Sequence, residues 1–249
     1  MSKVKKIIIA ALIFVVLAIV AMIPIPYVIE SPGTAEEVSQ FLTISGAKDE
    51  DPGSLRVLTV YVEQATVLTY FKKFLKHHEM VPSEEVFGDY TPEEFNALQE
   101  FSMRNARSKA VRVAFEAAGK TVERQVNGIF VTRVDKNSNF RDKLQVGDII
   151  ETIDGKSPGN TDESFEALRY YLAGLEPGHT LVLQVKRDDA TQTISAQLKM
   201  NSRTGGIRLG FAGEVDEDVT SDPSVEFDPH GVSGPSGGLM FTLEIYNQI

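Results

Sequence analysis

A small-residue segment near residue 236 has the residue types of a nucleophilic site. Ser236 lies between Gly234, Pro235 and Gly237, and these neighbours leave space around its Oγ atom. The residues that follow have the apolar spacing of a helix. A helix starting here would direct free N–H groups and the positive end of its dipole at an oxyanion. The segment predicts a reactive serine, and a glycine-rich turn without chemistry is the alternative that these residues alone leave open.

Other reactive groups give weaker patterns. Ser233 is an alternative nucleophile and His230 an alternative base, because both closely precede Ser236. The chain has no Cys, which excludes a Cys nucleophile, disulfides and a thiolate zinc site. His78 begins a segment like the H-E-x-x-H zinc motif, but Pro82 stands at the second His position. We therefore predict neither a metal nor a cofactor.

The N-terminal segment would fix this site to a membrane. The uninterrupted apolar run Ile7–Ile23, with its uncharged flank, is about long enough to cross a hydrocarbon core of roughly 30 Å. Lys3, Lys5 and Lys6 precede the run, so the positive-inside rule places the N-terminus in the cytoplasm. We predict a signal anchor over residues 1–29 with the rest of the chain outside the cell membrane. A cleaved signal peptide is the alternative.

The charge balance argues against one class of partner. The chain has 25 Lys and Arg against 35 Asp and Glu, a net charge of −10. A nucleic-acid binder needs a basic face, so no nucleic-acid partner is predicted. The acidic run Glu214–Asp218 is interpreted as a solvated loop, because it lacks the ligand spacing of a calcium loop.

The first elements after the anchor mix strand and helix. Leu55–Val62 is rich in β-branched residues and predicts a buried strand. Thr66–Lys76 has apolar residues at helical spacing. Thr91, Pro92 and Glu94 form a helix start of the capping-box type, and Gly119 suits the end of that helix.

Short strands and turns follow from about residue 122. Strands are predicted at 129–131, 149–150, 181–185 and 193–198, with turns at 144–148, 153–156 and 186–189. A helix is predicted over 160–173, with Asn160 and Glu163 as its capping pair and Gly174 as its end.

This stretch, about 122–200, resembles a PDZ domain of the bacterial protease type. The resemblance rests on residues 128–131, the LxVGDIIxxIDGK run 144–156, the helix, and the run 177–188. It implies that strand Ile129–Val134 accepts a peptide as an added strand, although the preceding loop is not Gly-rich. The implied peptide-binding residues are Gly128, Ile129, Phe130, Val131, Phe165, Leu168 and Leu172. For the last three, a core role is the alternative.

The segment from Gly234 to Leu239 is similar to the nucleophile segment of Lon-type serine proteases, although Gly237 replaces the usual Ala. Residues 30–35, 62–66 and 114–120 also resemble the membrane-anchored, PDZ-containing Lon-like proteases of Gram-positive bacteria. The resemblance implies an α+β fold with the PDZ domain (122–200) inserted into a protease domain formed by 31–121 and 201–249.

It also implies an ATP-independent endopeptidase in which Ser236 is the nucleophile and a lysine is the general base. No Lys follows Ser236 before Ile249. The base is therefore expected beyond Ile249, and the chain by itself is expected to be incomplete and inactive. The expected partners are protein or peptide substrates and the cytoplasmic membrane, and a homo-oligomer stays open. The alternative function is an inactive, anchored PDZ peptide-binding protein.

Overall fold

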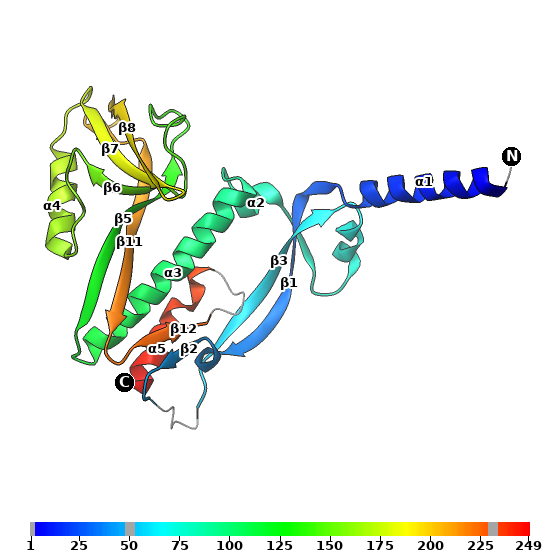
Figure 1. Ribbon diagram of the computed structural model, residues 1–249, viewed down its shortest axis with the longest axis horizontal. Coiled ribbons are helices and arrows are strands. Elements are labelled where there is room, and N and C mark those ends of the chain that lie inside the picture. Colours follow the sequence, from blue (N-terminus) through cyan, green and yellow to red (C-terminus); the bar gives the residue numbers. More distant parts are fainter. Residues whose placement is uncertain (1–2, 48–52, 229–233) are drawn as a thin grey trace. The chain divides into compact units, whose positions relative to one another are not determined.

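The computed structural model describes residues 3–47, 53–228 and 234–249, which form a mixture of helices and sheets (Figure 1). The chain divides into two compact units. The first comprises Met1–Glu36 and Arg56–Pro92, and the second comprises Glu37–Leu55 and Glu93–Ile249. The mixed α and β content agrees with the predicted class, whereas the domain boundaries stay a prediction.

The first unit combines an apolar helix with a three-stranded sheet of order β3-β1-β4. Its elements are α1 (Lys3–Ala21), β1 (Pro24–Glu37), β3 (Arg56–Thr66), the 3₁₀ helix η2 (Thr69–Phe74), β4 (Glu79–Pro82) and α2 (Ser83–Phe87). Within the described ranges, α1 is the one helix long and apolar enough to cross a membrane. The predicted N-terminal apolar helix is therefore present, and its insertion into a membrane stays a prediction.

Strand β3 corrects the prediction of a buried strand at Leu55–Val62. The segment is extended as predicted, but most of its side chains are exposed, and Leu58 is 83% exposed. The reason is its position, because β3 lies at an edge of its sheet and has β1 as its neighbour there. The helix predicted over Thr66–Lys76 is also shorter than expected, since only Thr69–Phe74 is helical and its form is 3₁₀.

The second unit contains the elements that position both predicted sites. They are η1 (Val38–Gln40), β2 (Leu42–Ile44), α3 (Pro92–Ala117), β5 (Val122–Val134), β6 (Ile149–Ile153), α4 (Asp162–Ala173), β7 (Thr180–Arg187), β8 (Ala190–Gln197), β9 (Lys199–Met200), β10 (Ile207–Arg208), β11 (Phe211–Ser221), β12 (Val225–Phe227), η3 (Pro235–Gly237) and α5 (Gly238–Gln248). The predicted helix from Pro92 to Gly119 is confirmed as α3.

A five-stranded antiparallel sheet of order β11-β5-β6-β7-β8 forms the larger part of this unit. Its core includes Ile150, Leu181, Leu183 and Val185, and α4 packs on this core through Leu168. Figure 1 shows β5 and β11 as a long two-stranded ribbon that continues beyond the short strands β6, β7 and β8. The four strands predicted between 129 and 198 are confirmed as parts of β5, β6, β7 and β8.

The start of α4 differs from its predicted cap. Thr161 is the N-cap, and it forms a capping box with Ser164. Asn160 is instead bonded across the fold, because its Oδ1 accepts a hydrogen bond of 2.9 Å from the N–H of Val126. The predicted end of the helix at Gly174 is confirmed.

The other side of the ribbon carries α3 and α5. Phe101 of α3 stacks on Phe130 of β5, with ring centroids 4.0 Å apart. Phe241 of α5 packs edge-on against Phe41 and Phe227, next to the pairing of β12 with β2. A close approach at Gly238, whose Cβ would lie 3.5 Å from Cβ of Ala106, brings the start of α5 against α3.

Candidate functional site

The Ser236 segment forms a compact turn that leads into α5. Ser236 lies in η3 and is exposed, whereas Gly234 and Gly237 are buried. Gly234 has φ 100°, a conformation that favours glycine. A Cβ at Gly237 would lie 2.9 Å from Cε2 of Phe241, so a small residue fits here best. The turn thus presents the Ser236 hydroxyl to solvent on a backbone that its small neighbours make accessible.

The N-terminus of α5 has the features of an anion site next to this serine. Its N-cap is Gly237, which supplies no side-chain cap, and its first turn has no acidic residue. The first-turn N–H groups of a helix have no acceptor within the helix, and the dipole places partial positive charge there. The N–H of Gly238 donates to the carbonyl oxygen of Pro235 in η3, so the candidate donors to an oxyanion are the N–H groups that follow it. This arrangement can stabilise a developing oxyanion, provided that a base activates the hydroxyl.

Three upstream lysines, Lys109, Lys120 and Lys199, each contact a group other than Ser236 within the described residues. Lys109 Nζ lies 3.7 Å from Glu214 Oε2. Lys120 Nζ donates a hydrogen bond of 2.9 Å to the carbonyl oxygen of Ile249, at the opposite end of α5. Lys199 donates to the carbonyl oxygen of Asn137. The alternative residues Ser233 and His230 lie outside the described residues.

The predicted peptide-binding strand is an interior strand of the sheet. Gly128, Ile129, Phe130 and Val131 are all buried. Ile129 and Phe130 pair with β6, while β11 pairs with β5 along its length on the other edge, from Val122 to Val134. A peptide cannot add beside Ile129–Val134 while β11 occupies that edge, so direct strand addition, as expected from the sequence, is closed in this structure.

Gly128 is confined by the neighbouring strand. A Cβ at this position would lie 2.6 Å from the carbonyl oxygen of Ile150. The α4 residues predicted to face the groove pack inward: Leu168 is 3% exposed, and Phe165 and Leu172 lie against the same core. Their packing fits the core role, which was the alternative, and a part in peptide binding stays a prediction.

The acidic run Glu214–Asp218 corrects the prediction of a solvated loop. It lies within β11, and Asp216 and Glu217 are each 3% exposed. Arg104 Nη2 donates to Asp216 Oδ1 at 2.9 Å, and Arg124 Nη2 donates to Glu217 Oε2 at 2.6 Å. These ion pairs of buried carboxylates attach the acidic strand to α3 and β5, although the Arg104 side chain itself is half exposed.

Sequence reasoning missed these pairs because the partners are far apart in the chain. Arg124 is central to the second pair, since it also donates to Asp162 at the start of α4. Burial lowers the pKa of Arg124, but its hydrogen bonds to Asp162 and Glu217 outweigh that effect and raise the pKa above its ordinary value. One feature of the sequence could have indicated these pairs. Arginines on the predicted helix occur together with an acidic run that is long enough to form a strand.

The acids of the PDZ-like motif have structural roles. Asp148 is buried and accepts hydrogen bonds of 2.6 and 2.7 Å from Arg187. Asp154 lies in the turn after β6. Its carboxylate accepts a hydrogen bond from the N–H of Val182 and is also hydrogen-bonded to the side chains of His179 and Tyr171. Burial raises the pKa of Asp154, but these hydrogen bonds outweigh it and hold the pKa below its usual range.

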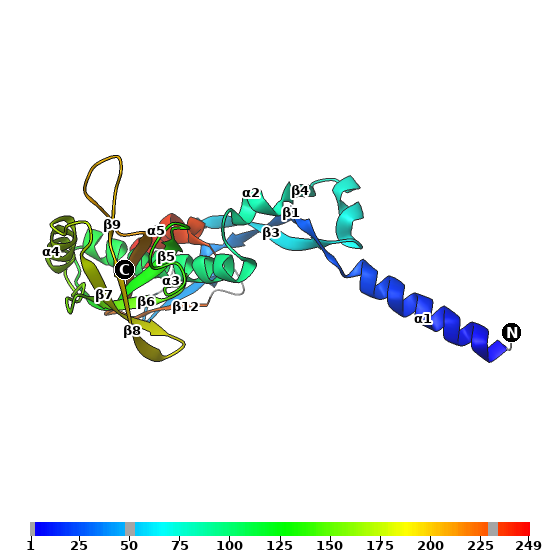
Figure 2. The same cartoon turned by 90° about the horizontal axis from the view of Figure 1, so that it is seen from above.

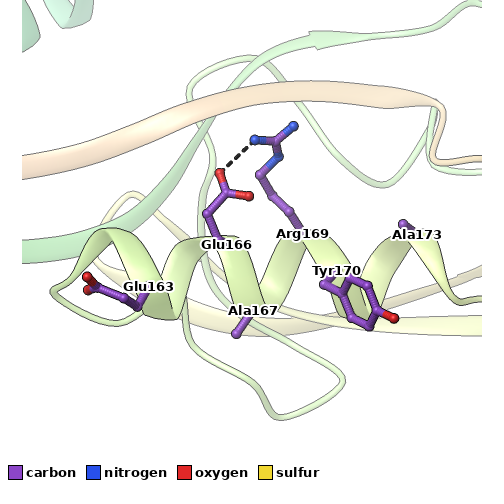
Figure 3. A pocket seen from close by; sticks show the side chains of 6 residues that line it. All are labelled: Glu163, Glu166, Ala167, Arg169, Tyr170 and Ala173. Carbon is purple, nitrogen blue, oxygen red and sulfur yellow. Dashed lines mark hydrogen bonds and ion pairs between the residues drawn. The ribbon is translucent and has the colours of Figure 1, made fainter.

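A shallow pocket of about 630 Å³ lies along the exposed side of α4. Figure 3 shows Glu166 and Arg169 bonded to each other within it, and Tyr170 directed away from them. It is distinct from the groove predicted from Phe165, Leu168 and Leu172. Among the described residues, no group of three or more His, Asp or Glu side chains could bind a metal ion.

Comparison with known proteins identifies the domain that contains most of the five-stranded sheet. A family model described as the PDZ domain matches residues 102–198. The chain is similar to the PDZ domain of an SdrC-like protein from Listeria monocytogenes, at 22% identity over 36% of this chain and 90% of that one, with a TM-score of 0.31. The corresponding domain from Listeria innocua is similar at 23% identity over 35% and 94% of the two chains, again with a TM-score of 0.31. No curated protein matches the chain.

The matched segment begins within α3, contains β5, β6, α4, β7 and β8, and ends before β11. The strand that closes the edge of β5 therefore lies outside the family match. The predicted PDZ domain is confirmed by the family match, which places it at residues 102–198, and peptide binding by this chain stays a prediction.

Proposed function

We propose that this chain is the anchored part of an ATP-independent serine endopeptidase of the Lon-like type, with Ser236 as its nucleophile. The observation that carries the proposal is the exposed Ser236 in the small-residue turn at the uncapped N-terminus of α5. The PDZ domain adds peptide or protein binding, which suits an enzyme that acts on polypeptides. The apolar helix α1 would keep the enzyme at the cytoplasmic membrane, with the PDZ domain outside.

The chemistry would be acyl transfer. Ser236 Oγ attacks the peptide carbonyl, and the general base takes its proton. First-turn N–H groups of α5 would stabilise the oxyanion of the tetrahedral intermediate. The base then delivers the proton to the leaving amine, and water releases the acyl group. The resemblance implies a lysine as the base, and it must be neutral to accept the proton, which burial favours by lowering its pKa.

The substrate class follows from the modules proposed. The PDZ domain would capture flexible peptide segments, and the anchor would restrict action to chains near the membrane. Stable folded substrates are not expected, because no ATP-driven unfolding is part of the proposal. Since β11 occupies the edge of β5, capture at that edge requires β11 to separate locally from β5.

The test is an assay of the full-length reading frame in membranes with a fluorogenic unfolded protein as substrate. Ser236→Ala should abolish cleavage, and Ser233→Ala, a matched neighbour, should leave it. Retained cleavage in Ser236→Ala would refute the nucleophile assignment. Loss in Ser233→Ala alone would transfer the role to that residue.

A second function is favoured by one observation: the family match covers residues 102–198, the PDZ domain. On this reading the chain is an anchored PDZ peptide-binding protein without activity. It predicts peptide capture by the full-length protein together with no cleavage in either the parent or Ser236→Ala.

A further inference from the structure

A cluster of apolar side chains is exposed around the 3₁₀ helix η2 in the first unit. These residues, named here the η2 cluster, are Val67, Leu68, Tyr70, Phe71, Phe74 and Leu75. Phe74 is 76% exposed, and all six have large exposed fractions. Single exposed apolar residues are ordinary, but a contiguous group of this kind marks a contact surface.

The η2 cluster is bonded directly to the C-terminal end of α1. The N–H of Leu68 donates to the carbonyl oxygen of Ala21 at 2.9 Å, and the N–H of Val67 donates to the carbonyl oxygen of Ile23 at 3.1 Å. The N–H of Leu68 thus satisfies one of the carbonyls that the end of a helix leaves without a partner, and the N–H of Val67 binds the chain two residues after that end. Figures 1 and 2 both show the short coil of η2 beside the junction of α1 with the sheet.

This attachment sets the depth of the cluster if α1 spans the membrane. The 19 residues of α1 give a length of roughly 28 Å, close to the hydrocarbon thickness of about 30 Å. Ala21 would then lie at one boundary between hydrocarbon and headgroups. Because Leu68 is bonded to Ala21, the η2 cluster would lie within a few ångströms of the same boundary.

The side chains of η2 are arranged for such a boundary. Residues three apart eclipse one another in a 3₁₀ helix, so Leu68, Phe71 and Phe74 share one face. Lys73 lies three residues after Tyr70 in the adjoining row, and Lys76 follows in the turn after η2. Lys73 Nζ lies 4.0 Å from the centre of the Tyr70 ring. Aromatic and aliphatic side chains beside lysines are typical of surfaces that contact anionic lipid.

The local charges agree with a lipid partner of negative charge. Lys72 is paired with Glu63 of β3, so its charge is compensated within the protein. Lys73 donates to the hydroxyl of Tyr70 and contacts the rings of Tyr70 and Phe74, which are neutral groups and do not compensate its charge. Lys76 follows η2 in the chain, and Glu79 at the start of β4 is the next acid along it.

We propose that the η2 cluster is a membrane-interfacial contact for an anionic phospholipid bilayer. Leu68, Phe71 and Phe74 enter the boundary between headgroups and acyl chains, and Lys73 and Lys76 contact lipid phosphates. The inference rests on the proposed anchoring by α1 and deepens it, since it adds a second contact with the bilayer directly after the anchor.

The chain contains no Trp, so a single introduced Trp reports its own surroundings. Phe74→Trp places the probe in the η2 cluster. Leu58→Trp is the matched control, because Leu58 is an exposed apolar residue of the same unit, eight positions before Thr66 at the end of β3. Both full chains are reconstituted in vesicles of phosphatidylcholine with phosphatidylglycerol, with and without brominated acyl chains.

We expect Phe74→Trp to emit at shorter wavelength and to lose fluorescence in brominated vesicles, and Leu58→Trp to do neither. Adding Lys73→Glu and Lys76→Glu to Phe74→Trp should reduce the quenching in anionic vesicles. Vesicle flotation distinguishes the interfacial contact of the η2 cluster from membrane anchoring by α1. An unquenched Phe74→Trp chain that still floats with the vesicles overturns the interfacial contact alone, while a chain that does not float overturns the anchor as well. A shift to shorter wavelength without quenching assigns the cluster to a protein contact and also overturns the inference.

Discussion

Two strands of equal length, β3 and β11, have opposite relations between composition and burial. Each has 11 residues. β3 is rich in apolar residues, yet its Leu58 is 83% exposed. β11 contains the acidic run, yet Asp216 and Glu217 are each 3% exposed. The difference teaches that neighbours decide burial: arginines compensate the acids of β11, while the described part of the first unit leaves the apolar residues of β3 at a sheet edge.

The largest effect should come from breaking a buried pair of β11. Arg124→Ala leaves Glu217 buried with Arg112 as its remaining cation, 3.8 Å away. Removal of one partner of a buried ion pair destabilises by about 3–5 kcal/mol when the remaining charge is uncompensated, and the partial compensation by Arg112 places the expected loss at the lower end of this range. The measurement is urea unfolding of the full chain in detergent, followed by circular dichroism.

Arg169→Ala is the matched control for this change. Its pair with Glu166 is 2.7 Å long, but the two side chains are 64% and 65% exposed. Surface pairs contribute about 0–1 kcal/mol, so this variant should unfold almost as the parent does. Equal effects of the two substitutions would contradict the assignment of β11 as an internally compensated strand.

The next effect concerns access to β5. If peptides bind beside Ile129–Val134, their apparent affinity is reduced by the fraction of molecules in which β11 is separated. Asp216→Asn keeps the shape of the side chain but weakens its attraction to Arg104, which should raise that fraction. We expect capture of a pooled library of peptides with free carboxyl termini to rise by several fold, measured by pull-down on immobilised protein.

One outcome would contradict the prediction that peptides bind beside β5. Unchanged capture by Asp216→Asn, with Arg169→Ala also unchanged, would place peptide binding away from β5. The outer edges of β11 and β8 would then be the remaining strand edges of this sheet.

These comparisons also show why the sequence predicted some features and not others. The ends of α3 at Pro92 and near Gly119, and the turn before α5, depend on residues close in sequence, so local patterns found them. The burial of Glu217 depends on Arg124, 93 positions away. The cap of α4 was displaced by one residue because Asn160 is bonded to Val126, 34 positions away. The turn that holds Ser236 depends on neighbouring residues, whereas the closure of the edge of β5 depends on pairing with β11, which is distant in sequence.

A smaller effect is expected with pH, and it should come from the acid-containing unit. Hydrogen bonds from Arg124 lower the pKa of Asp162, and those at Asp154 outweigh the effect of its burial and lower its pKa too. A carboxyl group whose pKa is lower in the folded state binds fewer protons when folded, so its stabilisation is complete above the unfolded pKa of about 4. It is lost as the pH falls through the folded pKa.

The check is the urea midpoint between about pH 6 and pH 3, a range that spans the ordinary carboxyl pKa. Asp154→Asn should lower the midpoint near neutral pH and flatten the decline toward acid, since the titrating group is gone. A decline as steep as that of the parent would show that the acid sensitivity arises elsewhere in the chain.

The smallest effect should come from the apolar strand. Leu58→Ser in β3 removes an isobutyl group that is already exposed, so little apolar surface returns to water on unfolding. Surface substitutions of this kind stay within about 0.5 kcal/mol, and urea unfolding of the full chain in detergent should show that size. Leu181→Ala, at a fully buried position of the PDZ core, should cost about 2–5 kcal/mol in the same assay. If Leu58→Ser lowered the free energy of unfolding as much as Leu181→Ala, β3 would have to be covered in the folded protein. The contrast with β11 would then disappear, because both strands would be buried against partners suited to their side chains.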